Sequence, residues 1–355
     1  MSKTQISWLL ALTIVAAVVL MLLPGKTGIE STFEVKPLVP GLDARVNDIT
    51  RVRISRGGNI PVATLVRGEK GWQIEEAELY PADWPRLKSL LAALAQANVI
   101  ELKTSNPEYM DRLGLVDIER EDSSALQLEL GEGEGLIVLL VGNAAREREG
   151  QFVRFADTSQ ALLIDRPLDV GRETADWLER GIVDLAEAEV VEVDISHPDG
   201  EQIRIRKISA DDTDFSLLDI PDGREIQSKW SVNALGGSLA DLQLDEVKAD
   251  TAIDWSQAVK LRALTADGVE VNAELASGDG VNWLRLSAAV YPAAGDEEAV
   301  TAPRNDESEP QAPASRKRVE EINHRTGGWA YSIPAYKAQL MNKRLEDLLA
   351  ARKDS

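Results

Sequence analysis

An uninterrupted apolar stretch near the amino terminus constrains this chain more than any other feature of its sequence. Residues 6–23 (ISWLLALTIVAAVVLMLL) contain no charged side chain. At about 1.5 Å per residue, a helix of this length spans roughly 27 Å, close to the thickness of the hydrocarbon core of a bilayer. The stretch ends in Pro24 and Gly25, without the small-x-small cleavage site of a secretory signal. We therefore expect an uncleaved anchor in residues 1–25 that contacts the lipid bilayer from Ile6 to Leu23.

The charges beside this stretch predict its orientation. Lys3 and the free amino group precede it, and Lys26 follows it. Because positive charge is retained on the cytoplasmic side, we expect the amino terminus in the cytoplasm and the bulk of the chain in the periplasm of a bacterium, after a single pass through the inner membrane.

Composition excludes several classes of function. The chain has no cysteine, which excludes disulfides, thiolate catalysis, cysteine-bound metals and a lipid-modified cysteine. The formal net charge of −21 argues against nucleic acid or an anionic lipid surface as the main partner, because both would be repelled. A basic or neutral partner fits this charge, and so does the simpler interpretation that acidity keeps the body soluble.

The segment after the anchor predicts a tether and then a first folded unit. Residues 26–47 hold scattered prolines and glycines without a sustained period, which is typical of a linker. Within residues 48–185, Asp83 can cap a helix that has Pro85 in its first turn and leucines at three- and four-residue spacing. We also expect a helical turn over 107–113 and a second helix over 167–179. Alternating polarity predicts strands at 49–55, 62–66, 72–74, 99–102, 125–130, 136–141, 151–155 and 161–164.

The second half of the chain repeats this order of patterns. Trp230 precedes a helix as Trp84 does, and Val247 follows that helix as Val99 follows the first. We therefore expect an α+β fold in which an amino-terminal transmembrane helix is followed by two tandem copies of a mainly antiparallel sheet-plus-helix unit, 48–185 and 186–355. The strands of the second copy are expected at 190–196, 202–207, 214–218, 259–262, 283–286 and 329–334.

An insertion interrupts the second copy. Residues 292–318 are rich in Pro, Ala, Asp and Glu and have little to bury, which predicts disorder in a long surface loop. The basic end of the insertion, Arg316, Lys317 and Arg318, together with Trp8 in the anchor, forms our set of candidate partner contacts. A solvated loop is the simpler interpretation of the insertion.

No catalytic, cofactor or metal site is predicted. The two histidines, His197 and His324, lie far apart and have no second ligand at a metal-binding spacing. Ser196 beside His197 does not form a nucleophile pair, because neighbours on a strand point to opposite faces. The glycines at 131–135 alternate with glutamates that would repel a phosphate, and they are better explained as a hairpin turn. The eight tryptophans are interpreted as core residues, with a carbohydrate platform as the alternative.

Several of these motifs together resemble a known family. The order of a lone amino-terminal span, the Gly-Trp-x-Ile hairpin at 71–74, Ala82-Asp83 before a leucine-rich helix, Tyr109 with Leu113-Gly114-Leu115, and Gly142 before Gln151-Phe-Val-Arg is similar to the domain of unknown function 4340 family. That resemblance implies a bacterial, membrane-anchored protein that accompanies an inner-membrane ABC-type permease and a gliding-motility-type auxiliary protein. The family brings no catalytic residues.

The function expected from the sequence is therefore a non-enzymatic periplasmic accessory subunit of an ABC-type transport system. The competing hypothesis is a module that binds the cell wall or a polysaccharide through an exposed cluster of Trp or Tyr. An enzyme would need a convergent polar pocket, which the sequence does not offer.

Overall fold

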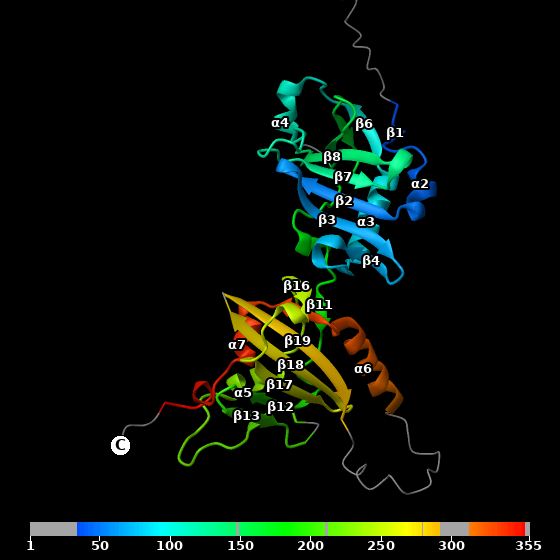
Figure 1. Ribbon diagram of the computed structural model, residues 1–355. Coiled ribbons are helices and arrows are strands. Elements are labelled where there is room, and N and C mark those ends of the chain that lie inside the picture. The colour runs from blue at the N-terminus through cyan, green and yellow to red at the C-terminus, as the bar shows by residue number, and fades with distance from the viewer. Residues whose placement is uncertain (1–33, 147–148, 210–211, 279, 292–311, 352–355) are drawn as a thin grey trace, which may run out of the picture.

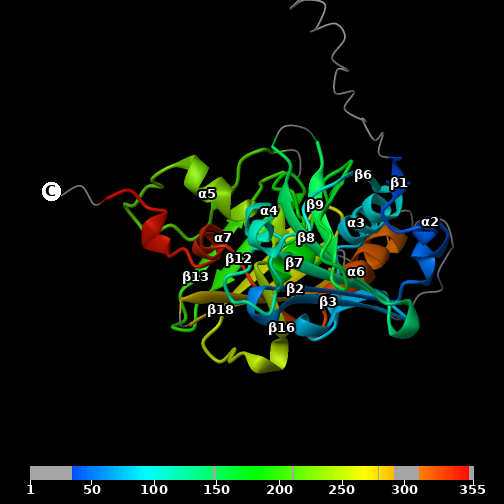
Figure 2. The same ribbon diagram turned by 90° about the horizontal axis from the view of Figure 1, so that it is seen from above.

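The chain folds into two lobes that follow one another along a long axis (Figure 1). The computed structural model describes residues 34–146, 149–209, 212–278, 280–291 and 312–351. Seen along the long axis, the two lobes overlap in part, and one side of the second lobe projects beyond the first (Figure 2). Each lobe is built on one antiparallel sheet with helices beside it, which confirms the predicted α+β class.

The first lobe contains a ten-stranded antiparallel sheet of order β1-β6-β10-β9-β8-β7-β2-β3-β4-β5. Its buried positions alternate along the strands, as β7 shows with Leu126, Leu128 and Leu130 inside, and this alternation is what made the strands predictable. The strands are β1 (Lys36–Pro37), β2 (Arg51–Arg56), β3 (Ile60–Gly68), β4 (Gly71–Ile74), β5 (Tyr80–Pro81), β6 (Asn98–Leu102), β7 (Leu126–Leu130), β8 (Ile137–Ala144), β9 (Gln151–Phe155) and β10 (Leu162–Ile164).

The main helix of this lobe, α3 (Trp84–Gln96), begins where the sequence predicts. A side-chain oxygen of Asp83 accepts a hydrogen bond from the amide of Arg86 at 2.9 Å, which satisfies a donor left free by the first helical turn. The leucine stripe of α3 is buried against the sheet. Two shorter helices complete the lobe: α2 (Leu42–Arg45) and α4 (Met110–Leu113).

The second lobe contains an eight-stranded antiparallel sheet of order β14-β13-β12-β17-β18-β19-β20-β16. Its strands are β12 (Val190–Ser196), β13 (Gln202–Arg206), β14 (Ser216–Leu217), β16 (Glu246–Ala249), β17 (Val259–Thr265), β18 (Val269–Gly278), β19 (Val281–Val290) and β20 (Trp329–Ser332). A separate two-stranded sheet joins β11 (Gly181–Val183) to β15 (Leu242–Gln243). The helices are α5 (Lys229–Gly236), α6 (Ala312–Thr326) and α7 (Ala335–Met341).

The strand orders of the two large sheets correspond over eight positions. In the first sheet, β6-β10-β9-β8-β7-β2-β3-β4 run side by side, and in the second the run is β16-β20-β19-β18-β17-β12-β13-β14. The place of one helix in the chain also corresponds. In the first lobe α3 lies between β4 and β6, and in the second α5 lies between β14 and β16.

The two lobes meet at a cluster of aromatic rings. Tyr80 of β5 lies edge-on to Trp329 of β20, with ring centroids 5.1 Å apart, and 6.1 Å from the ring of Tyr331. The Tyr80 hydroxyl donates to the carbonyl oxygen of Glu179 at 3.2 Å, and burial raises the pKa of Tyr80 to about 12. One continuous hydrophobic core runs through both lobes across this junction.

The predicted tether is wrong for the part of it that the structure describes. Leu38, Val39 and Leu42 are buried in the core, and β1 pairs with β6. These apolar side chains cover the end of α3, so residues 34–47 belong to the first lobe. The predicted anchor, residues 6–23, lies outside the described residues. No helix in the described part of the chain is long and apolar enough to cross a membrane.

Two further local predictions are wrong. Residues 167–179 form only a short 3-10 turn, η6 (Thr174–Trp177), because the buried ring of Trp177 fixes this segment in an irregular conformation. The end of the insertion, residues 312–318, is the first half of α6, whereas residues 292–311 lie outside the description. The strands on either side of the insertion, β19 and β20, are hydrogen-bonded neighbours.

Helix α6 is held in place by polar side chains that reach the part of β19 beyond its short pairing with β20. The amide side chain of Asn323 accepts a hydrogen bond from the Ala288 amide at 2.7 Å and donates to the Ala288 carbonyl oxygen at 2.8 Å, as a neighbouring strand would. The hydroxyl of Thr326 donates to the carbonyl oxygen of Leu286 at 3.2 Å. The helix therefore covers an exposed strand edge, which composition alone does not reveal.

Candidate functional site

The histidines do not form a reactive centre in this fold. His197 is buried, and its Nε2 atom lies 2.9 Å from the carbonyl oxygen of Lys343. His324 is exposed on α6. Within the described ranges, no three His, Asp or Glu side chains are grouped so that they would hold a metal ion. The chemistry of the molecule must therefore be sought among its charged networks and its surface grooves.

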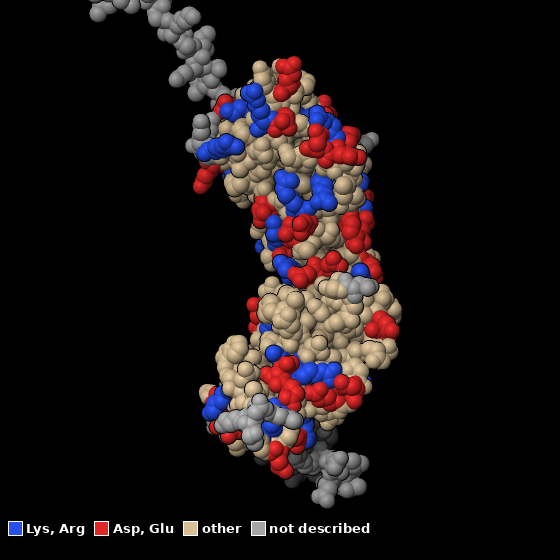
Figure 3. Space-filling view, turned by 90° about the vertical axis from the view of Figure 1, so that its left-hand side faces the viewer, with Lys and Arg blue, Asp and Glu red and all other residues tan. Residues whose placement is uncertain are grey.

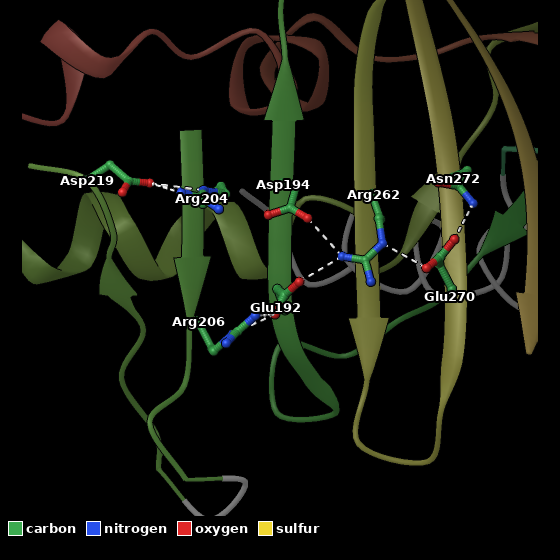
Figure 4. A network of polar contacts seen from close by, with 8 residues as sticks. All are labelled: Glu192, Asp194, Arg204, Arg206, Asp219, Arg262, Glu270 and Asn272. Atoms are coloured by element: carbon green, nitrogen blue, oxygen red, sulfur yellow. Dashed lines mark hydrogen bonds and ion pairs between the residues drawn. The ribbon is translucent and has the colours of Figure 1, made fainter. Parts of the chain in front are cut away.

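A charged network lies on one face of the second sheet (Figure 4). Arg262 of β17 is at its centre and donates to Glu192 at 2.7 Å and Asp194 at 2.8 Å, both on β12. On the other side Arg262 donates to Glu270 of β18 at 2.7 Å. The three strands are neighbours, and the alternation of side chains places all four residues on the same face of the sheet.

Pairing keeps the carboxylates of this network ionised. Partial burial alone would raise the pKa of Glu192, but hydrogen bonds from Arg262 and Arg206 outweigh it and lower that pKa. Burial would likewise raise the pKa of Glu270, but the hydrogen bonds from Asn272 and Arg262 outweigh burial, so this pKa is also lowered. A carboxylic acid that acts as a general acid near neutral pH needs a raised pKa instead. We interpret the network as a structural ladder that ties three strands together.

A groove in the first lobe combines exposed aromatic rings with positive charge. Trp72 of β4 and Trp84 at the start of α3 stack with their ring centroids 6.4 Å apart and their planes inclined by 8°. The groove has a volume of about 580 Å³. Apolar side chains of Ile49, Ala82 and Leu91 form part of its wall. The groove therefore has an aromatic wall that can contact the apolar face of a ligand.

Local structure explains why these two rings meet at the surface. The amide of Ala82 donates to the carbonyl oxygen of Trp72 at 2.9 Å, which places the start of α3 beside the end of β4. Side chains on a helix lean towards its amino terminus, so Trp84, the first residue of α3, extends beyond the layer that buries Leu87. Trp84 remains 47% exposed, and Trp72 is partly buried beside it.

The rim of the groove is basic. Arg67, Lys70 and Lys88 line it, and none of the three forms an ion pair with a carboxylate in the described part of the chain. The guanidinium of Arg67 is oriented by a hydrogen bond from Nη1 to the carbonyl oxygen of Asn47 at 2.9 Å. One acidic residue, Glu179, also lines the groove, and its Oε1 atom lies 4.0 Å from Nε of Arg325 in the second lobe.

The candidate partner contacts predicted from sequence are separated by the structure. Trp8 lies outside the described residues. Arg316 and Lys317 are exposed on α6, where Lys317 lies 3.7 Å from Glu321 one turn later. Arg318 instead forms two ion pairs within the second lobe, with Glu189 at 2.8 Å and with Asp267 at 3.3 Å. Arg318 therefore fixes α6 to the sheet.

The prediction that Trp84 and Trp230 are core residues is wrong. Trp230 is 79% exposed on α5, and Trp84 faces the groove. Trp177 and Trp283 are buried as expected. The basic residues of the groove carry no signal that sequence reasoning could use, because they come from β3, the turn after it and α3, which meet only in the fold.

The fold and the groove define a two-lobed, mainly antiparallel α+β protein with an aromatic surface site. The model of the family described as a domain of unknown function (DUF4340) matches residues 72–273, more than half of the chain. The chain therefore belongs to this family, and the matched region extends from β4 of the first lobe to β18 of the second. No curated protein and no solved structure matches the chain.

Proposed function

We propose that this protein is a non-enzymatic accessory subunit of an ABC-type transport system, anchored in the inner membrane by residues 6–23 with its two lobes in the periplasm. The observation that carries the proposal is the exposure of large aromatic side chains. Trp230 on α5 is 79% exposed and Tyr336 on α7 is 61% exposed. A chain selected for stability alone would bury such rings, and exposed aromatics are enriched where proteins bind each other.

The helices that carry these rings form a firm platform. The buried ammonium of Lys337 donates to the carbonyl oxygen of Gly237 at 3.2 Å and also to that of Ala240, which ties α7 to the end of α5. Helix α7 lies on the left of the lobe in Figure 1, the side that faces the viewer in Figure 3. That face of the second lobe is largely free of charged side chains just below the junction (Figure 3). Such a surface suits a protein partner whose contact is itself weakly charged.

We also propose that the two lobes are copies of one ancestral unit. The support is the shared order of eight strands in the two large sheets and the matching place of α3 and α5 in that order. Independent convergence on eight strands in the same order is improbable among the arrangements open to an antiparallel sheet. In this proposal the copies have diverged in their surfaces, with a basic aromatic groove on the first and an uncharged face on the second.

The proposal is tested by purification of the full-length, carboxyl-terminally tagged protein from its native membranes after mild crosslinking. We expect an ABC-type permease among the crosslinked partners. The double variant Trp230→Ala/Tyr336→Ala should recover severalfold less permease, whereas the matched variant Trp84→Ala in the other lobe should recover as much as the natural protein. Absence of every permease subunit from the crosslinked material would refute the proposal.

The alternative function, binding of a cell-wall polysaccharide, is favoured by a different observation. The stacked rings of Trp72 and Trp84 form an open aromatic surface of the kind on which sugar rings pack. The two functions use separate lobes and do not exclude each other. The Trp84→Ala variant separates them, because it should weaken glycan binding and leave the permease contact unchanged.

A further inference from the structure

We propose that the groove between β4 and α3 binds an acidic polysaccharide, one whose pyranose rings carry carboxylates. The indoles of Trp72 and Trp84 pack against the sugar rings, and Arg67, Lys70 and Lys88 pair with the carboxylates. This inference rests on the geometry and charge of the first lobe and does not depend on the transport system.

The aromatic pair determines the shape of the ligand. The two rings stack with their planes inclined by only 8°, so Trp72 holds the indole of Trp84 in a fixed orientation beside the groove. The groove volume of about 580 Å³ is in the range of small-ligand sites and accommodates a few sugar rings. Trp84 is 47% exposed, so its face is accessible without any movement of the core.

Charge determines the chemical class of the ligand. The whole chain carries a formal charge of −21, yet the groove is lined by three cations and one carboxylate. That carboxylate, Glu179, lies 4.0 Å from Arg325, which offsets its charge. In the described part of the chain, Arg67, Lys70 and Lys88 have no carboxylate partner of their own. The local field of the groove therefore favours an anion, against the charge of the molecule as a whole.

The arrangement of these groups favours a sugar acid over an acidic peptide. A peptide offers flexible side chains, which would lose conformational entropy on packing against the indole of Trp84. A pyranose ring is rigid. Its apolar face can pack against an indole while its equatorial carboxylate pairs with a cation of the rim. The same geometry disfavours a cationic ligand, because the cations of the rim would repel it.

The test measures binding of the full-length protein in detergent to oligogalacturonate. The matched neutral probe is the methyl-esterified oligomer, which keeps the sugar rings and removes the charge. We expect the acidic oligomer to bind and its methyl ester to bind about tenfold more weakly. Added salt should reduce this difference, because screening weakens the contacts with the rim.

Variants assign the binding to the groove. Trp84→Ala should weaken binding of the acidic oligomer by about tenfold or more, and Lys88→Gln by a few-fold. Trp230→Ala removes an exposed tryptophan of the second lobe and should leave binding unchanged. Circular dichroism and thermal unfolding confirm that the Trp84 variant is folded, so a loss of binding cannot be attributed to unfolding.

Four results would overturn the proposal. The first is absence of binding of the natural protein to the acidic oligomer, and the second is equal affinity for the acid and its ester. The third is unchanged binding by Trp84→Ala, which would place the site elsewhere. The fourth is equally tight, Trp84-dependent binding of polyglutamate, which would make the groove a site for acidic peptides.

Discussion

Replacement of Arg262 by methionine should destabilise the protein by about 2–4 kcal/mol at neutral pH. Methionine keeps the apolar stem that covers the sheet and removes only the charge. Three carboxylates, those of Glu192, Asp194 and Glu270, would then lie on adjacent strands without their shared cation. They would also repel one another across the sheet.

The magnitude follows from the exposure of the network. Measured ion pairs at exposed positions contribute about 0–1 kcal/mol, whereas removal of one partner from a buried pair costs about 3–5 kcal/mol. The side chain of Arg262 is 23% exposed and its carboxylate partners are 13–27% exposed, so the network lies between these limits. Three carboxylates share Arg262, but Glu192 keeps Arg206 as a second partner, so the estimate stays between the two limits.

The assay is urea denaturation of the purified natural and variant proteins, followed by tryptophan fluorescence. Arg204→Met is the matched control, because Arg204 lies in an exposed position on β13 and Asp219 is its one ion-pair partner among the described residues. We expect this control to lose about 1 kcal/mol or less.

The pH dependence gives an independent check on the cause. The pKa values of Glu192 and Glu270 are lowered in the folded protein, so their pairing stabilises it above the ordinary carboxyl pKa of about 4.3. This stabilisation is lost as the pH falls through the lowered values. The difference between the natural protein and Arg262→Met should therefore be largest at pH 7 and shrink below about pH 4. A loss under 1 kcal/mol at pH 7, or a loss independent of pH, would refute the reasoning.

Three further predictions concern other parts of the chain. Trp177→Ala should cost about 3–5 kcal/mol in urea denaturation because its ring is fully buried, whereas Trp230→Ala should cost under about 1 kcal/mol; equal losses would contradict the assigned burial. A reporter enzyme that works only in the periplasm should be active when fused after Ser355, and activity of a cytoplasm-only reporter there would reverse the proposed orientation. Because burial raises the pKa of Tyr80 from 10.0 to about 12, stability should fall as the pH rises from 10 towards 12, and this fall should be smaller in Tyr80→Phe; an unchanged slope in that variant would show that Tyr80 is not responsible.

Local patterns in the sequence were sufficient to predict most elements of the fold. Alternating polarity located most strands of both lobes, although β16 and β18 were not predicted, and Asp83 with Pro85 located the start of α3. These signals are reliable because they depend on neighbours within a few residues. A strand with one buried face needs an alternating pattern, and a helix start needs an acceptor for its free amides.

Two of the wrong predictions, those for Trp84 and for residues 312–318, failed because burial depends on partners that are distant in the sequence. Trp84 lies three residues before Leu87 and seven before Leu91, so helical periodicity assigns it to the buried stripe. In the fold, however, Trp84 stacks on Trp72 of β4 at the groove and remains 47% exposed. The composition of residues 312–318 predicted disorder, yet Arg318 and the rest of α6 contact β19 and the turn before β18, which are remote in the chain.

The sequence by itself determined the α+β class, most of the strands and the family, because these follow from local periodicity and from the order of motifs. Only the tertiary structure decided where a ligand can bind. Trp72, Arg67 and Lys88 come from separate elements, and their approach depends on how α3 packs beside β4. A net charge of −21 also averages over the whole chain and conceals a local excess of cations. The groove therefore exists as a site only once the fold has brought its residues together.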